Sequence, residues 1–110
     1  MGSKNDSYYL SKALTDIDAI IKYTKNLTYD EFVSDVKTID SVMFRLIQLI
    51  ENIKNISIEF KQRHPHIPWG QIMGFRNGIV HEYGATDYST VYEIVSKNIF
   101  ELKDLFEKNL

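Results

Sequence analysis

The chain has 110 residues, of which 44% are hydrophobic and 25% charged, a composition typical of globular domains rather than disordered chains. One domain spanning residues 1–110 is expected, large enough to bury a core without disulfides. The absence of cysteine excludes thiolate metal sites. The net charge of −2 excludes a general attraction to nucleic acid or anionic membranes, so any contact with RNA must be local.

Membrane insertion and export are not expected from this sequence. No apolar run approaches the roughly 20 residues that a membrane-spanning helix needs. Residues 1–6 lack the apolar core of a signal peptide and are expected to be flexible or a cloning remnant. With the lack of cysteine, these features favour a cytoplasmic chain.

Apolar residues at three- and four-residue spacing predict a first helix over residues 7–25. Asn26 is a suitable end for it, because asparagine tolerates the left-handed turn after a helix. Thr28 and Glu31 have the spacing of a capping box, and Leu27 and Phe32 have that of a hydrophobic staple. A short second helix should therefore begin after Thr28.

A long third helix is predicted from residue 36 or 37 to near residue 61. Its segment from Val42 to Ile50 is apolar almost all round, so it must bury more than one face. Two explanations are equally open from sequence. The helix is either the centre of a single bundle or in contact with a second subunit.

The prolines within residues 61–68 predict a loop, with Pro68 as the first residue of the next helix. That helix is expected from Trp69 to about Tyr83, with Gly84 as its C-cap. Asp87 or Thr86 can cap a last helix, whose apolar stripe comprises Tyr88, Val91, Tyr92, Val95, Ile99, Leu102 and Phe106. No segment alternates with period two. An all-α, up-down bundle of four main helices plus a short second helix is predicted.

The helix from Trp69 carries glycines at an unusual spacing. On an ideal helix, its core-facing sector comprises Trp69, Ile72, Met73, Ile79 and Val80. The opposite side carries Gly70, Gly74, Gly78, Asn77 and His81. Each interior glycine costs about 0.5–1 kcal/mol relative to alanine. Close approach of something to the backbone would explain this ridge. Tight packing against another helix is the favoured cause, and a second subunit or a nucleic-acid or nucleotide backbone are the alternatives.

Arg76 falls inside the apolar sector of the same ideal helix. A buried guanidinium needs a carboxylate, for which Glu51 is a candidate, or a place at the rim of a cleft. The pattern alone favours a structural ion pair over a functional arginine. Arg76 and His81 stand about 140° apart, so one ideal helix does not aim both at one atom. A distorted helix end or two copies of the motif across a two-fold axis would bring them together.

The motif Arg76-x4-His81-x-Tyr83, with Asn77 after the arginine, resembles the HEPN superfamily and within it the HepT-like toxins. The resemblance extends to residues 28–32, to Ile50-Glu51 and to residues 67–69, and so covers nearly the whole chain.

The resemblance implies a metal-independent endoribonuclease that acts as a homodimer and needs no cofactor. In that scheme His81 is the general base or acid, Arg76 stabilises charge on the phosphate, and Asn77 helps to position phosphate or His81. It also implies a type VII toxin–antitoxin pair, in which a nucleotidyltransferase antitoxin adds AMP to Tyr83 and blocks the cleft.

A basic segment and two other functional classes complete the predictions. Lys61, Arg63 and His64 are candidate RNA contacts, although a solvated loop explains them equally well. His64 and His66 are poor evidence for a metal site, and none is predicted. The alternative function is a non-catalytic, substrate-binding accessory subunit of a nucleotidyltransferase, and a third is a helical dimerisation module.

Overall fold

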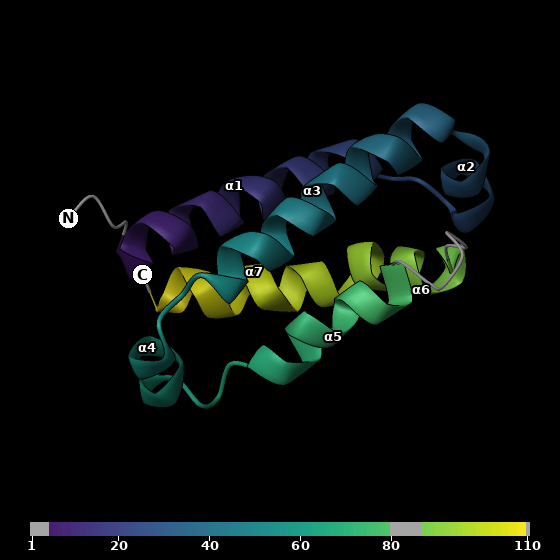
Figure 1. The fold of residues 1–110 in the computed structure, drawn as a ribbon. Helices are drawn as coiled ribbons and strands as arrows, with labels where there is room; N and C mark the ends of the chain where they lie inside the picture. The colour runs from purple at the N-terminus through teal and green to yellow at the C-terminus, as the bar shows by residue number, and fades with distance from the viewer. Residues whose placement is uncertain (1–4, 80–86, 110) are drawn as a thin grey trace.

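The computed structural model describes residues 5–79 and 87–109, and all regular structure in these ranges is helical (Figure 1). The elements in chain order are α1 (Asp6–Thr24), α2 (Tyr29–Ser34), α3 (Val36–Lys54), α4 (Ile58–Arg63), α5 (Trp69–Ile79), α6 (Tyr88–Glu93), the π-helical turn η2 (Ile94–Asn98) and α7 (Ile99–Lys108). The predicted all-α class is confirmed. None of the described helices combines the length and apolar character needed to cross a membrane.

The described helices form a bundle around one apolar core. The long helices α1 and α3 lie side by side, and α5 packs against α3 while the α6–η2–α7 run packs against α1 (Figure 1). Side chains from every described helix enter this core. Its fully buried large members are Phe32, Phe106, Leu10, Ile17, Ile20, Leu46, Leu49, Ile53, Ile67, Ile72, Ile79 and Ile99. The predicted helical bundle is therefore confirmed.

The segment between α1 and α2 has the predicted turn and cap. Asn26 adopts the left-handed conformation, with φ 63°. The Glu31 N–H donates to Thr28 Oγ1 at 3.2 Å, and the Thr28 N–H donates to Glu31 Oε1 at 2.9 Å. This reciprocal capping box satisfies two backbone donors at the start of α2. Phe32 is fully buried just after it.

Asp35 caps the start of α3. Its carboxylate accepts hydrogen bonds from the Thr38 hydroxyl at 2.8 Å and the Thr38 N–H at 3.2 Å. These bonds lower the pKa of Asp35 below its ordinary value. Because the folded-state pKa is depressed, the stabilisation is present above the ordinary carboxyl pKa. It is lost as the pH falls through the lowered value.

The prediction of a single helix reaching residue 61 is wrong, because α3 ends at Lys54. The Asn55 side chain donates to the Glu51 carbonyl at 3.0 Å, and Ser57 starts α4 by accepting from the Phe60 N–H at 3.1 Å. The Asp6 carboxylate accepts from both the N–H and the hydroxyl of Ser57, at 2.8 and 2.7 Å. This anchor between distant parts of the chain holds the break in place.

The other boundaries around α4 change accordingly. Residues 61–63 belong to α4, so the loop covers residues 64–68 rather than 61–68. Helix α5 begins at Trp69, and the Pro68 carbonyl accepts from the Ile72 N–H at 3.0 Å. The predicted start at Trp69 is confirmed, but Pro68, predicted as the first residue of the helix, lies one position before it. The predicted continuation of this helix beyond residue 79, with its C-cap, lies outside the described residues.

The predicted last helix contains a π-helical turn, η2. Asp87 caps its start by accepting from the Thr90 N–H at 3.1 Å, as predicted. The wider turn places both Ile94 and Val95 in the core and then continues the buried stripe at Ile99. A π turn accommodates one extra residue, which regular spacing does not reveal.

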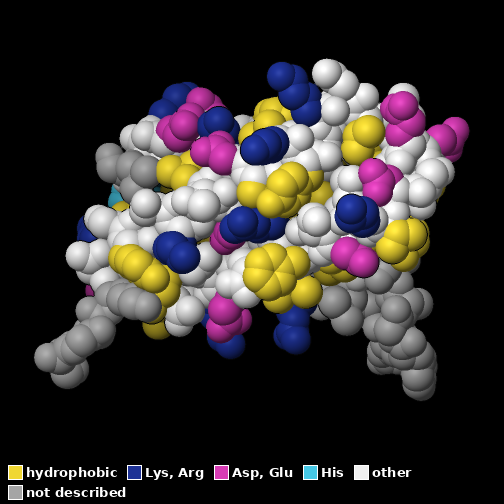
Figure 2. Space-filling view, turned by 90° about the horizontal axis from the view of Figure 1, so that it is seen from above, with side chains coloured by type: hydrophobic (Ala, Val, Ile, Leu, Met, Phe, Trp, Pro, Cys, Tyr) yellow, Lys and Arg dark blue, Asp and Glu magenta, His cyan; other side chains and the backbone are white. Residues whose placement is uncertain are grey.

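One chain buries only one apolar face of α3. Val42, Leu46 and Leu49 are fully buried, whereas Phe44 is 57% and Ile47 49% exposed. Figure 2, viewed from the side of α1 and α3, shows separate apolar patches among charged side chains on this face. A single bundle therefore does not account for Phe44 and Ile47. Burial of this second face by another subunit stays a prediction.

Candidate active-site cleft

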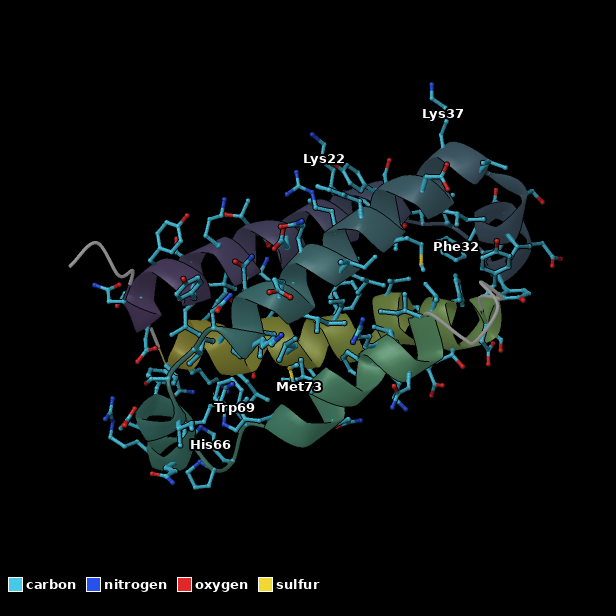
Figure 3. All side chains as sticks on the ribbon, in the orientation of Figure 1. Lys22, Phe32, Lys37, His66, Trp69 and Met73 are labelled. Atoms are coloured by element: carbon cyan, nitrogen blue, oxygen red, sulfur yellow. The ribbon has the colours of Figure 1, made fainter. Side chains whose placement is uncertain are left out.

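A cleft of about 320 Å³ lies between α3 and α5. Its apolar lining comprises Ile47 and Ile50 from α3 and Met73 and Ile79 from α5. Figure 3 shows Met73 on the side of α5 that faces the rest of the bundle. The charged residues lining the cleft are Glu51, Lys54 and Arg76. The cleft thus combines an apolar floor with one carboxylate and two cations.

Helical periodicity places these residues on facing walls. Ile47, Ile50, Glu51 and Lys54 recur at three- and four-residue spacing, so they share one side of α3. Met73, Arg76 and Ile79 recur every three residues on α5. The sequence contains this pattern, but it does not show that the two stripes face each other. Sequence reasoning named Glu51 as a candidate neighbour of Arg76, and the cleft brings the two together, but it did not place Lys54 in the same cleft.

Arg76 is exposed within this cleft. The ion pairs between described residues join Arg45 to Asp16, Lys103 to Asp18 and Lys108 to Asp104, and none involves Arg76. Glu51 shares the cleft but forms no ion pair with Arg76, so the predicted structural pair is absent from the described part of the chain. The other prediction, an arginine at the rim of a cleft, is confirmed. Such a guanidinium is available to bind a phosphate.

The remaining described residues of α5 divide as predicted between core and surface. Ile72 and Ile79 are buried and Asn77 is exposed. A Cβ atom added at Gly70 or Gly74 would meet nothing within 4 Å. Packing against the described part of the chain therefore does not explain these two glycines. A second subunit or a nucleic acid remains as the predicted cause of the open ridge.

The second half of the sequence motif is not covered by the described part of the chain. His81, Tyr83, Val80, Gly84 and Thr86 lie in the segment 80–86, outside the described residues. Their predicted catalytic, modification, core and capping roles stay predictions. Arg76 and Asn77 are the motif residues whose surroundings are known.

The basic segment is held by aromatic contacts at the N-terminal end of α5. His64 stacks on Phe60 with ring centroids 4.1 Å apart, and its Nδ1 is 2.9 Å from the Phe60 carbonyl. The Lys61 ammonium lies 5.9 Å from the ring centroid of Trp69, and the Arg63 guanidinium lies 5.9 Å from that of Phe60. Burial lowers the pKa of Lys61. His64 thus has a structural role, which sequence reasoning did not foresee.

This segment lies away from Arg76. Figure 3 shows Trp69 and His66 beside α4, at the start of α5. Trp69 precedes Arg76 by seven residues, or about 10 Å along a helix axis. Within one chain the basic segment is therefore separate from the α3–α5 cleft, and its RNA contacts stay a prediction. Among residues 5–79 and 87–109, no group of three or more His, Asp or Glu side chains is arranged to hold a metal.

The all-α bundle and the spacing of Arg76, Asn77 and His81 define a HEPN-type helical domain. The model of the family described as "Ribonuclease HepT-like" matches residues 13–108. The chain belongs to this HepT-like ribonuclease family. No solved structure matches the chain.

Several curated relatives are similar over nearly the whole chain. "Putative RNase MJ1216" of Methanocaldococcus jannaschii is 35% identical over 109 residues, covering 98% of this chain and 89% of the relative. "Putative RNase MJ0125" of the same organism is 34% identical over 109 residues, covering 98% and 93%. "Probable ribonuclease HepT" of Thermococcus cleftensis is 33% identical over 100 residues, covering 91% of each chain. The family and these names agree with the predicted ribonuclease class.

Proposed function

We propose that this protein is the toxin of a type VII toxin–antitoxin pair, an endoribonuclease that cuts RNA without a metal in a cleft shared by two subunits. The observation that carries the proposal is the environment of Arg76. In a chain of a ribonuclease family, this guanidinium is exposed in a concave site and forms no ion pair with a described residue. That is the arrangement needed for binding the phosphate of an incoming strand.

The proposed chemistry uses the ribose 2′-hydroxyl as nucleophile. His81 takes its proton, the 2′ oxygen bonds to phosphorus, and the bond from phosphorus to the 5′ oxygen breaks. The leaving 5′ oxygen takes a proton from a second acid, and the products are a 2′,3′-cyclic phosphate and a 5′-hydroxyl. Arg76 stabilises the charge that develops on the non-bridging oxygens. Asn77 positions the phosphate or His81.

Three features support a site shared between two subunits. Arg76 and His81 stand about 140° apart on an ideal helix, which favours two motifs meeting across a two-fold axis. Ile47 lines the cleft and is 49% exposed, so an exposed apolar face continues from it. The ridge at Gly70 and Gly74 is open to close approach by another molecule. In a shared cleft, Arg76 of one chain and His81 of the other can act on the same phosphate.

Mixing two inactive variants tests the shared cleft. We expect Arg76→Ala and His81→Ala homodimers each to cleave RNA at least about 100-fold more slowly than the unaltered protein. Subunit exchange between them should restore cleavage, because the heterodimer holds one Arg76 and one His81 on opposite chains. Cleavage of a fluorescent RNA before and after exchange measures this, with light scattering to confirm dimers.

A self-contained site gives the opposite result, since no chain in the mixture then carries both residues. No recovery after proven exchange, or a monomer at micromolar concentration, would contradict the shared cleft. If the unaltered chain binds a nucleotidyltransferase but cuts no RNA, the chain acts instead as a non-catalytic accessory subunit.

Tyr83 is the proposed site of control. A minimal nucleotidyltransferase with ATP and Mg²⁺ should add AMP to the unaltered chain, detected by mass spectrometry, and should abolish cleavage. The added nucleotide fills the cleft and repels RNA phosphates through its negative charge. Tyr83→Phe should cleave RNA and resist this inhibition, whereas Tyr88→Phe, the matched control, should be modified normally. Full inhibition of Tyr83→Phe would place the modification elsewhere.

A further inference from the structure

We propose that the α3–α5 cleft binds one guanine nucleotide of the RNA strand and that Glu51 recognises its base. This inference rests on the proposed ribonuclease function and adds a base preference to it. It derives from the three charged side chains of the cleft and from its apolar floor.

The size and floor of the cleft suit a nucleotide. Its volume of about 320 Å³ lies at the lower end of the roughly 300–1,000 Å³ of small-molecule sites. Ile50 and Ile79 are buried at the floor, and the accessible apolar surface of the cleft comes from Ile47, which is 49% exposed, and from the partly buried Met73. Apolar side chains such as these pack against the flat face of an unstacked base. The backbone phosphate is then left to the cations at the rim.

Glu51 is the feature of the cleft that phosphate binding does not explain. A carboxylate repels RNA phosphates, so its presence beside Arg76 weakens backbone binding. It is exposed, and neither Arg76 nor Lys54 forms an ion pair with it. Its two oxygens are therefore available to a ligand. An ionised carboxylate only accepts hydrogen bonds, so the ligand must present donors.

Guanine is the base that best matches a carboxylate. Its N1–H and N2 amino group are adjacent, parallel donors, and single-stranded RNA exposes this edge. Adenine and cytosine place a ring acceptor beside their amino group, and uracil places its single N–H between two carbonyls. Each of these acceptors faces the second carboxylate oxygen and is repelled by it. Glu51 therefore selects guanine, with uracil the poorest ligand.

The charged side chains of the cleft contact different parts of the RNA strand: the cations bind phosphates and the carboxylate binds the base. Glu51 and Lys54 lie three residues apart on α3, and Arg76 lies on α5. Arg76 binds the phosphate to be cut, Lys54 binds a neighbouring phosphate, and Glu51 holds the base. The base preference thus depends on Glu51, whereas phosphate binding depends on the two cations.

Cleavage of short RNAs that differ at one position tests the proposal. The varied position is the nucleotide whose base the cleft holds. The unaltered protein should cut substrates with guanine there at least about tenfold faster than substrates with uracil there, as expected for one bidentate base contact. Glu51→Gln should still cut RNA but lose most of this preference, because an amide presents a donor where guanine also has one. Glu93→Gln removes an exposed carboxylate outside the cleft and should keep the preference.

Cleavage without regard to base, or a full guanine preference in Glu51→Gln, overturns the proposal. If the unaltered protein cuts no RNA, the proposed function fails, and nucleotide binding decides this inference separately. His81→Ala should then bind guanosine monophosphate at least about tenfold more tightly than uridine monophosphate by calorimetry. His81→Ala combined with Glu51→Gln should lose that difference, and equal binding of the two nucleotides to His81→Ala would reject the site. Circular dichroism and light scattering check the fold and assembly of each variant.

Discussion

Replacing Arg76 with alanine lowers the rate of RNA cleavage by roughly 10²–10³-fold, the usual cost of removing one group that stabilises transition-state charge. The free energy of unfolding changes by no more than about 0.5 kcal/mol. This combination is expected because Arg76 is exposed in the cleft and pairs with no described carboxylate. Initial rates on a fluorescent RNA and urea unfolding measure the two quantities.

Two further variants separate charge from geometry. Lys22→Ala removes one cation from the exposed surface of α1, where Figure 3 shows Lys22 directed away from α5, and should leave the rate unchanged. Arg76→Lys keeps the charge but loses the planar fork, and should recover only part of the activity. If Arg76→Ala cleaves at the unaltered rate, the reaction does not use this arginine. If it unfolds instead, Arg76 is structural.

Caps and turns that depend only on neighbouring residues were predicted correctly from the sequence. The Thr28–Glu31 capping box, the turn at Asn26 and the cap at Asp87 each depend on a few neighbouring residues, and all three are present. Such short-range hydrogen bonds compete mainly with water, so sequence alone indicates them. The helix ends at these caps and at this turn were predicted for the same reason.

The break between α3 and α4 could not be predicted in this way. Ser57 is held by Asp6, which lies 51 positions earlier in the chain, and no local pattern contains that contact. An apolar spacing that continues through residue 56 instead suggested one long helix. The π turn at η2 was not predicted either. Ile94 and Val95 are adjacent and both apolar, and the sequence does not show that the backbone widens to bury both of them.

The environment of Arg76 shows where ideal-helix geometry misleads. The angular sector placed Arg76 with the core residues, and Ile72 and Ile79 on that sector are indeed buried. A long arginine side chain can nevertheless follow an apolar surface and place its charge at the rim. Whether that charge lies in a cleft depends on the neighbouring helix α3, which forms the facing wall. Sequence therefore identified Arg76 and suggested Glu51 as its neighbour, and the packing of α3 against α5 showed that the two line one cleft with Lys54.

Replacing Asp16 with alanine lowers the free energy of unfolding by about 2–4 kcal/mol. Asp16 is only 4% exposed, and its carboxylate accepts from Arg45 Nη1 at 3.0 Å and Asn52 Nδ2 at 2.9 Å. The same contact is the main reason that the pKa of Arg45 is raised. Alanine removes both charge-assisted bonds and leaves a space in the interface between α1 and α3. Urea unfolding followed by circular dichroism measures the loss.

Asp18→Ala is the matched control on the same helix. Asp18 pairs with Lys103 at 3.0 Å, but its side chain is 59% exposed, so its loss should cost no more than about 1 kcal/mol. Equal losses for the two variants would show that the buried network contributes nothing special. Because Arg45 and Asn52 flank the cleft residues Ile47 and Glu51 along α3, Asp16 also fixes one wall of the cleft. Asp16→Ala should therefore reduce cleavage at temperatures where the variant is still folded, whereas Asp18→Ala should not.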